Sequence, residues 1–207
     1  NINWLKSTIV VVVVNNSKKS PVEFKKNNKL LIEILKKSKF NFNLEIIDAS
    51  TKGLELPENY AGVGLARKIG IDLILPYMQS KSSLIFCTDS DVTVSPNYLK
   101  TVIEQFKENQ LSAAVLGFKH RKSNLENIEL AIRLYEKFLK DTAKYLKEAG
   151  SPYSYVSMGS TMVCTLEAYC AVGGMSKKKA TEDFYFLQSL AKFCKIKSIN
   201  KELVFPS

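Results

Sequence analysis

Two carboxylates follow a short apolar run near the middle of the chain. Residues 84–88 form an apolar segment of strand length, and Asp89 and Asp91 come directly after it as an Asp-x-Asp pair. In open α/β sheets, ligands bind at the carboxyl ends of the strands. Two carboxylates there suit Mg²⁺ or Mn²⁺, which prefers a few carboxylates together with phosphate oxygens and water. A surface turn with capping aspartates would give the same short pattern.

A second acidic pair, Glu182 and Asp183, opens an expected helix near the end of the chain. Thr181 is the N-cap candidate, and acids in a first turn are favoured by the helix dipole, so capping alone would also account for the pair. A loop containing Gly173 and Gly174 comes shortly before it. Glycines there would allow the backbone to approach a bound ligand closely.

A glycine-rich segment, Gly62-Val-Gly64-Leu-Ala-Arg67-Lys-Ile-Gly, superficially matches a dinucleotide-binding motif. It fails that test because Arg67 occupies the third glycine position and no expected strand immediately precedes Gly62. Glycines followed by a cation at the start of a helix can still contact a phosphate or a nucleobase through backbone N–H groups and the guanidinium.

Apolar runs of strand length alternate with amphipathic runs of helical length, which predicts an α/β fold with a largely parallel sheet. The β-branched run at 8–14 is expected to be a central strand buried on both faces. Further strands are expected at 44–47, 84–88, 111–118, 161–164 and 196–199, and helices at 22–37, 65–77, from Ser95 and Pro96 onward, at 128–146 and from 182 onward.

Two of these helices are amphipathic. In the helix at 22–37, Phe24, Leu31, Ile34 and Leu35 share one face and lysines lie opposite. The helix at 128–146 carries a mainly apolar stripe, ends at Gly150, and is expected to pack across the sheet or to contact a partner.

The composition excludes several classes of protein. With 207 residues, 45% hydrophobic and 24% charged, the chain has the make-up of one soluble globular domain. Its apolar runs are too short for a membrane-spanning helix of about 20 residues. The four cysteines (Cys87, Cys164, Cys170 and Cys194) lack the spacing of a zinc site and are expected to be reduced thiols.

The chain carries a formal net charge of +10, from 30 Lys and Arg against 20 Asp and Glu. Such a charge raises the question of nucleic-acid binding, but no nucleic-acid motif is present and many of the basic residues alternate with acids. Anionic small molecules or an anionic membrane surface are the preferred explanations for the charge.

In their order along the chain, these features resemble the family 2 glycosyltransferases of the GT-A fold over nearly the whole sequence. The order is the specific part: a first strand ending at Asn15-Asn16, a second ending at Asp48, the Gly62 to Gly70 segment, Asp89 and Asp91, Gly159-Ser160, Gly173-Gly174, and Thr181-Glu182-Asp183. The resemblance implies a single GT-A domain over 1–207, a Rossmann-like nucleotide-diphospho-sugar transferase with a mostly parallel central sheet flanked by helices. Because the chain stops soon after the last expected strand, we expect its acceptor-binding elements to be short, truncated or supplied by a partner.

The resemblance also implies roles for residues that would bind the donor. Asn15 and Asp48 would bind the nucleotide, with Asp48 hydrogen-bonded to the nucleobase. Arg67 would lie against the base or the diphosphate. Asp89 would contact the ribose or a divalent metal, Mn²⁺ or Mg²⁺, of which Asp91 would be the principal ligand.

On the acceptor side, the family pattern implies that Asp183 is the general base, with Glu182 beside it. The loops at Gly159-Ser160 and Gly173-Gly174 would contact the donor sugar or the acceptor. The implied reaction is a single, inverting displacement from a nucleotide sugar, with a UDP-sugar favoured over a GDP- or dTDP-sugar. The acceptor would be a saccharide or a lipid-linked saccharide in glycan, glycolipid or cell-envelope polysaccharide synthesis. The implied location is the cytoplasm, including peripheral contact with the anionic inner face of a membrane, and no nucleic acid is involved.

Some features depart from the family, and two alternatives stay open. The first strand ends without the usual proline, and His120, the only histidine, lies too far upstream to be the late metal ligand of many GT-A enzymes, so we interpret it as a strand-end residue. Asp89 and Asp91 also fit a haloacid-dehalogenase-like phosphatase, in which the first Asp is the nucleophile. A non-catalytic binding or scaffolding module, with the 128–146 stripe as its partner face, is the second alternative.

Overall fold

The computed structural model describes residues 4–207, and the chain divides into two compact units. The first unit comprises Asn1–Met78 and Gly174–Glu182, and the second comprises Gln79–Gly173 and Asp183–Ser207. The expectation of one domain over 1–207 stays a prediction, and its first three residues lie outside the described part of the chain. No helix among the described residues is long and apolar enough to cross a membrane.

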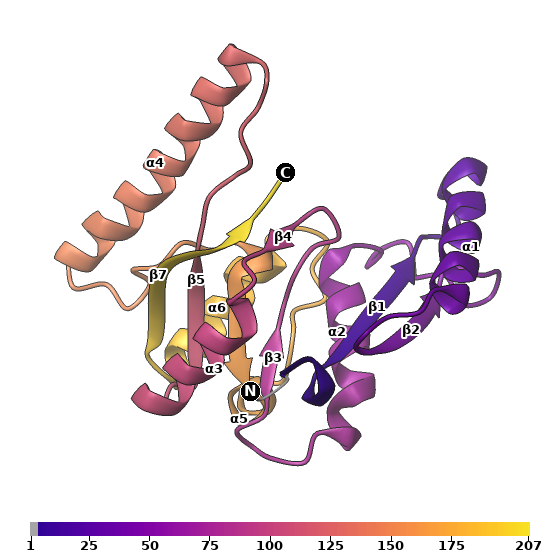
Figure 1. The fold of residues 1–207 in the computed structure, drawn as a ribbon, viewed down its shortest axis with the longest axis horizontal. Helices are drawn as coiled ribbons and strands as arrows, with labels where there is room; N and C mark the ends of the chain where they lie inside the picture. Colours follow the sequence, from indigo (N-terminus) through magenta and orange to yellow (C-terminus); the bar gives the residue numbers. More distant parts are fainter. Residues whose placement is uncertain (1–3) are drawn as a thin grey trace. The chain divides into compact units, whose positions relative to one another are not determined.

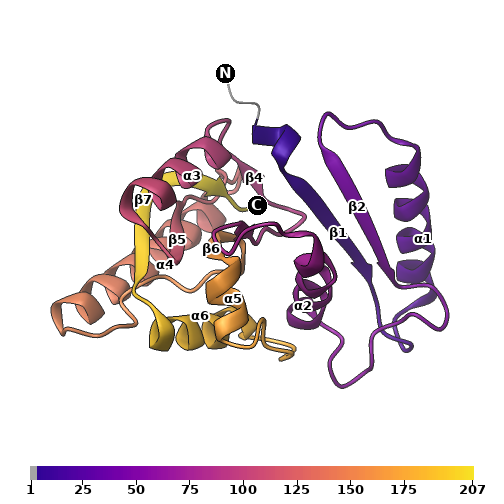
Figure 2. The same cartoon turned by 90° about the horizontal axis from the view of Figure 1, so that it is seen from below.

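The first unit is built on two parallel strands, β1 and β2, with Val12 beside Ile46 in the register. Helix α1 packs on both strands and α2 packs on β1, and Figure 2 shows the two helices on opposite sides of the strand pair. The bounds are η1 (Trp4–Ser7), β1 (Ile9–Asn15), α1 (Val22–Lys37), β2 (Asn43–Ala49), α2 (Val63–Ile74) and η2 (Leu75–Tyr77).

Strand β1 forms where the β-branched run predicts it, but it is less buried than expected. Within the first unit its partner is β2, and Val14 is the one buried residue of the seven in the strand. The expectation of a strand buried on both faces is therefore wrong for this unit. A β-branched run selects the extended conformation, whereas burial depends on what packs against the strand.

The second unit contains a five-stranded sheet in the order β3-β6-β5-β7-β4. Only β5 and β7 pair in parallel, whereas β3 with β6, β5 with β6, and β4 with β7 are antiparallel. The α/β class is confirmed, but the expected mostly parallel sheet is wrong here because hydrophobic periodicity predicts strands without their direction. The bounds are β3 (Leu84–Phe86), β4 (Thr93–Val94), α3 (Tyr98–Asn109), β5 (Ala113–Phe118), α4 (Glu126–Glu148), η3 (Gly159–Thr161), β6 (Met162–Thr165), α5 (Leu166–Ala171), α6 (Glu182–Phe193) and β7 (Ile196–Phe205).

The core of the second unit lies between α3 and the sheet. Val102 and Phe106 of α3 are buried together with Leu116 of β5, Val163 of β6 and Leu203 of β7. Burying each such side chain contributes roughly 1.5–3 kcal/mol. Helix α3 starts at Tyr98, later than the predicted start at Ser95 and Pro96, because the Tyr98 N–H donates to the Ser95 carbonyl in a turn that precedes the helix.

Helix α4 ends as predicted but keeps most of its apolar stripe in solvent. Gly150 has φ +74°, and its N–H donates to the Lys147 carbonyl, which satisfies a carbonyl of the last turn. Leu139 of this stripe packs on the core, whereas Ile128 and Tyr135 are 42% and 53% exposed. Figure 1 shows α4 standing away from the sheet of its unit, so the helix does not lie across the sheet, as one of the two expectations had it.

Candidate nucleotide-binding pocket and carboxylate sites

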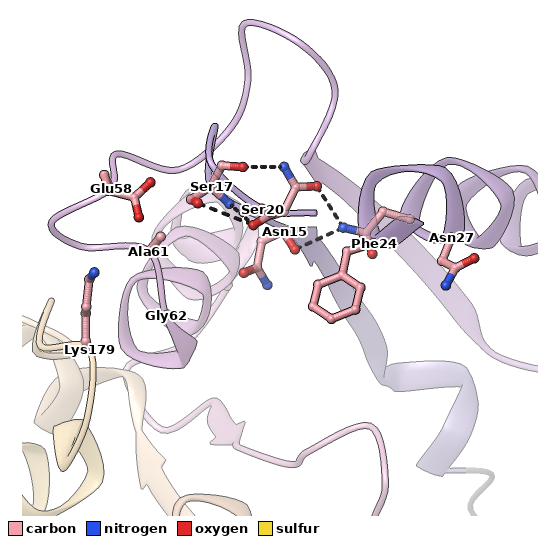
Figure 3. Close-up of a pocket in the computed structure, with 11 residues that line it drawn as sticks. Asn15, Ser17, Ser20, Phe24, Asn27, Glu58, Ala61, Gly62 and Lys179 are labelled. Carbon is pink, nitrogen blue, oxygen red and sulfur yellow. Dashed lines mark hydrogen bonds between the residues drawn. The ribbon is translucent and has the colours of Figure 1, made fainter. Parts of the chain in front are cut away.

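A pocket of about 400 Å³ lies at the carboxyl end of β1 in the first unit. Figure 3 shows Glu58 and Lys179 at one end of it, Phe24 and Asn27 at the other, and Asn15 between them. Its lining comprises Asn15, Asn16, Ser17, Ser20, Phe24, Asn27, Asn28, Glu58, Ala61, Gly62 and Lys179. Of the residues predicted to bind the nucleotide, Asn15 lies here.

Asn16 builds the wall of this pocket. Its buried amide group donates to the carbonyls of Ser17 and Ser50, at 3.1 and 3.2 Å, and its Oδ1 accepts from Asn28 Nδ2 at 2.8 Å. Asn28 also donates to the Asn15 carbonyl. These bonds tie the end of β1 to α1 and to the loop after β2, so the pocket is held by a hydrogen-bonded frame.

Asp48 is the next-to-last residue of β2 and is held by the loop that follows the strand. Its Oδ1 accepts from the Ser50 and Thr51 N–H groups and from Ser50 Oγ, and its Oδ2 accepts from Thr51 Oγ1 at 2.6 Å. Burial by itself raises the pKa of Asp48, but the hydrogen bonds from Thr51 and Ser50 outweigh that effect and lower the pKa to about 2. Asp48 is therefore a fixed anion at neutral pH, and its expected contact with a nucleobase stays a prediction.

Arg67 on α2 forms an ion pair with Glu182, and both side chains are largely buried. The segment leading to Glu182 lies close over the start of α2: a Cβ on Gly64 would lie 2.5 Å from the Lys178 carbonyl oxygen and 2.8 Å from Glu182 Cβ. The glycine-rich segment thus makes room for another part of its own chain. The expected contact of Arg67 with the base or the diphosphate stays a prediction, and so does the role of Glu182.

In the second unit, Asp89 and Asp91 lie in the loop between β3 and β4. The Asp91 side chain is exposed and accepts a hydrogen bond from Ser207 Oγ at 2.9 Å, while Arg121 donates to its carbonyl oxygen. Strand β3 ends at Phe86, two residues earlier than predicted, although the Cys87 N–H still donates to the Met162 carbonyl. The pair therefore follows a strand, as the pattern indicated.

Asp183 lies at the start of α6, half-buried, with its Oδ1 accepting from the Phe184 N–H at 2.8 Å. The predicted N-cap, Thr181, is wrong: it has φ +58°, and its hydroxyl donates to the Ala180 carbonyl instead of accepting from the helix. An N-cap residue needs extended backbone and a side-chain acceptor.

The two glycine loops have local structural explanations. Gly159 and Ser160 lie in the buried turn η3, where Ser160 is 2% exposed. Gly173 has φ +76° and ends α5, with its N–H donating to the Cys170 carbonyl, and Gly174 has φ +82°. Their expected roles at the donor sugar or the acceptor stay predictions.

His120 lies at the end of β5, as we interpreted it from the sequence. Its Nδ1 lies 3.0 Å from Glu136 Oε1, and the same oxygen accepts from the His120 N–H. Arg133 lies 2.9 Å from this carboxylate and donates to the His120 carbonyl, so the cluster fastens α4 to the end of β5. Burial by itself raises the pKa of Glu136, but the hydrogen bonds from His120 and Arg133 lower it overall.

The donor set around Asp89 and Asp91 fits a metal only with help from a substrate. No group of three or more His, Cys, Asp or Glu residues that could hold a metal occurs among residues 4–207. Two carboxylates nevertheless match the way Mg²⁺ is usually held, by one or two protein carboxylates with substrate phosphates and water. The chain therefore fits a metal that arrives with a diphosphate.

Comparison with known families settles the family of this chain. The model of Glycosyl transferase family 2 matches residues 45–163, more than half of the 207 residues. The chain belongs to glycosyl transferase family 2. The predicted family and enzyme class, glycosyltransferase, are thereby confirmed. The match favours a glycosyltransferase over the phosphatase alternative. The matched residues include Asp48, Arg67, Asp89 and Asp91 but not Asp183.

Solved structures of one protein share the fold of the family 2 chain. S. aureus TarS 1–349 is 15% identical with a TM-score of 0.56, and the alignment covers 96% of this chain and 50% of that one. The same TarS fragment in complex with UDP-GlcNAc is 14% identical with a TM-score of 0.58, covering 95% and 57%. This chain thus spans about half the length of those structures. No curated protein matches the sequence.

Sequence reasoning missed several pocket residues. Ser17 and Ser20 directly follow the end of β1, so a polar run after a strand could have indicated them. Phe24 was interpreted only as part of the apolar face of a helix. Spacing could not indicate Lys179, because it belongs to a lysine run more than 100 residues beyond the other residues that line the pocket.

Proposed function

We propose that this chain is the catalytic core of an inverting, metal-assisted glycosyltransferase that uses a nucleotide-sugar donor. The observation that carries the proposal is the family match over 45–163, because it spans Asp48, Arg67 and the Asp-x-Asp pair in the predicted order. The TarS structures in complex with UDP-GlcNAc and with UDP support a UDP-sugar as the donor. The acceptor is a saccharide or a lipid-linked saccharide, and the site of action is the cytoplasm or the inner face of a membrane.

In this proposal, the first unit holds the nucleoside. The pocket at the end of β1 offers amides and hydroxyls from Asn15, Ser17 and Ser20, and Asp48, which pairs with Val14 in the strand register, provides a fixed negative acceptor beside the end of β1. Asp89 and Asp91 would hold a divalent metal together with the donor's diphosphate. When bound, Mg²⁺ or Mn²⁺ supplies positive charge that stabilises the leaving diphosphate.

Asp183 acts as the general base. An acceptor hydroxyl attacks the anomeric carbon from the face opposite the nucleotide, the bond from that carbon to the diphosphate oxygen breaks, and the hydroxyl proton passes to the Asp183 carboxylate. One displacement inverts the anomeric centre. The hydrogen bond from the Phe184 N–H orients this carboxylate.

The metal site is tested by thermal shift with UDP-, GDP- and dTDP-sugars, each with and without Mn²⁺. We expect a UDP-sugar with Mn²⁺ to raise the melting temperature, because a ligand that binds only the folded state stabilises it. Asp91→Asn and a chelator should each abolish the metal-dependent part of that rise. Asp141→Asn, an acid of α4 outside the proposed site, is the control. An unchanged nucleotide-dependent rise in Asp91→Asn would show that the metal assignment is wrong.

The catalytic role is tested by Asp183→Asn. We expect this variant to keep the nucleotide-dependent thermal shift but to lose transfer by about 10²–10⁴-fold, as is typical when a general base is removed. Anomeric NMR of the product reads the stereochemistry. Retention of configuration in the wild-type product, or undiminished transfer by Asp183→Asn, would contradict the mechanism. Release of phosphate from an aryl phosphate by the wild type would instead support the phosphatase alternative.

A further inference from the structure

The positive charge of the chain is concentrated in one segment. Residues 17–39 contain eight lysines and two glutamates, Glu23 and Glu33, and therefore carry +6 of the formal +10. Helix α1 makes up most of this segment. The charge is thus a local feature of one surface helix of the first unit.

Helix α1 uses only a narrow side for packing. Ile32 is its buried residue, and Leu35 and Asn28 are half-buried beside it. Four of the five remaining apolar side chains lie on one exposed side: Phe24 is 58%, Leu30 55%, Leu31 41% and Ile34 51% exposed. The fifth, Val22, is the first residue of the helix and is also exposed.

A row of exposed lysines runs beside these apolar side chains. Lys26, Lys29, Lys36 and Lys37 recur at intervals of 3, 7 and 1, which keeps them on one side of a helix with 3.6 residues per turn. We call the four exposed apolar residues and these four lysines the α1 face.

We propose that the α1 face docks this protein on an anionic lipid surface. A surface helix that is apolar on one side and lysine-rich beside it lies in the plane of the headgroups, with its apolar side chains buried about 5–10 Å into the acyl boundary. The lysines beside them then lie at the level of the headgroups, where they meet the phosphates and carboxylates of anionic lipids. Charge complementarity therefore identifies the occupant.

Other occupants fit the α1 face less well. Phosphates of a nucleic acid would satisfy the lysines but would leave Leu30, Leu31 and Ile34 without apolar partners. A second copy of the chain, bound through the same surface on both subunits, would bring two segments of charge +6 together.

Helix α4 provides an internal comparison. It also exposes large apolar side chains, including Leu134 at 58% and Phe138 at 65%. However, Glu126–Glu148 contains five basic and five acidic residues, so its net charge is zero. Exposed apolar area alone is thus common to both helices, and the excess of lysine is specific to α1.

The test is cosedimentation of the whole chain with vesicles of phosphatidylglycerol and phosphatidylcholine, and with phosphatidylcholine alone. We expect binding to the anionic vesicles only, weakening as ionic strength rises from about 0.1 to about 1 M, where the Debye length falls from about 10 to about 3 Å. Leu30→Gln/Ile34→Gln and Lys26→Glu/Lys29→Glu should each lower the partition coefficient by at least about tenfold. Phe24 is left intact because it lines the pocket.

The matched control is Leu134→Gln/Phe138→Gln on α4, which should bind like the wild type. Circular dichroism and urea unfolding verify that all the variants fold. The proposal is overturned by a wild type that does not bind anionic vesicles, by equal binding to neutral ones, or by α1 variants that bind normally. A dimer that dissociates in the α1 variants, by light scattering, would instead assign the face to a second copy. The inference rests on the membrane location in the proposed function, and because the assay needs no nucleotide sugar, its failure would leave the proposed transfer reaction intact.

Discussion

At the scale of single residues, several predicted site residues are held by hydrogen bonds or ion pairs with neighbouring side chains. Asp48 is bonded by Ser50 and Thr51, and Glu182 is paired with Arg67. Such bonds hold side chains in one orientation before any ligand arrives, which lowers the ordering cost of binding. The residue types could be recognised in the sequence, but their bonding partners could not, because Arg67 and Glu182 are far apart along the chain.

Because of Asp48, the free energy of unfolding should fall at acidic pH. Its pKa of about 2 in the folded chain lies below the usual Asp value of about 3.9, so the ionised form favours folding. That stabilisation is present above about pH 4 and is lost as the pH falls toward about 2. Asp48→Asn should lower the free energy of unfolding by about 1 kcal/mol at neutral pH and reduce its acid dependence. Urea titrations between pH 7 and pH 2 measure both.

The control for this change is Glu45→Gln, an exposed residue of the same strand, which should leave the acid dependence unaltered. Equal loss of stability in the wild type and in Asp48→Asn between pH 4 and pH 2 would contradict the role given to these hydrogen bonds. Binding of a uridine nucleotide to the same variants separates a structural role of Asp48 from a role in recognition.

At the scale of elements, α2 packs against the segment that precedes Asp183 and is joined to it by an ion pair. Gly64 lets the backbone of Ser176 and Lys178 come close to the first turn of α2, and Arg67 on the same helix pairs with Glu182. The sequence pattern indicated a ligand-binding helix start at this point. The structure adds a packing reason for the glycines, which a spacing rule cannot distinguish from a phosphate site.

Gly64→Ala should therefore destabilise the chain although alanine is the better helix former. A Cβ there would lie 2.5 Å from the Lys178 oxygen and 2.7 Å from the Ser176 oxygen, and these are backbone atoms that cannot simply rotate away. We expect a loss of about 1–3 kcal/mol, as for other overpacked sites, against a gain from helix propensity of up to about 1 kcal/mol. The urea midpoint measures the net effect.

Gly62→Ala is the matched comparison, because its nearest contact, the Lys179 oxygen, is at 3.0 Å and the change should cost less. A Gly64→Ala protein as stable as the wild type would show that the segment over α2 moves aside freely. A loss of transfer activity in Gly64→Ala would show that the segment packed on α2 helps to position Asp183.

At the scale of the whole molecule, the net charge of +10 should speed the approach of an anionic donor. A positive field raises the association rate of an oppositely charged ligand and has little effect on dissociation. We expect the association rate constant of a fluorescent UDP analogue, measured by stopped flow, to fall as salt increases, while its dissociation rate changes little. A salt-independent association rate would mean that the positive charge does not attract the donor.

The sequence by itself predicted the order of the main strands and helices, but not β4 or α5, and it also predicted the stop of α4 at Gly150, the Asp-x-Asp pair after a strand, and the family. These depend on local periodicity, turn chemistry and the order of short motifs, all of which are written along the chain. Only the tertiary structure decided the direction of the strands in the second sheet, the exposure of the α1 face and the stripe of α4, and the pairing of Arg67 with Glu182. Each of these depends on which distant segments come together, and a stripe of apolar residues looks the same in sequence whether or not something packs on it.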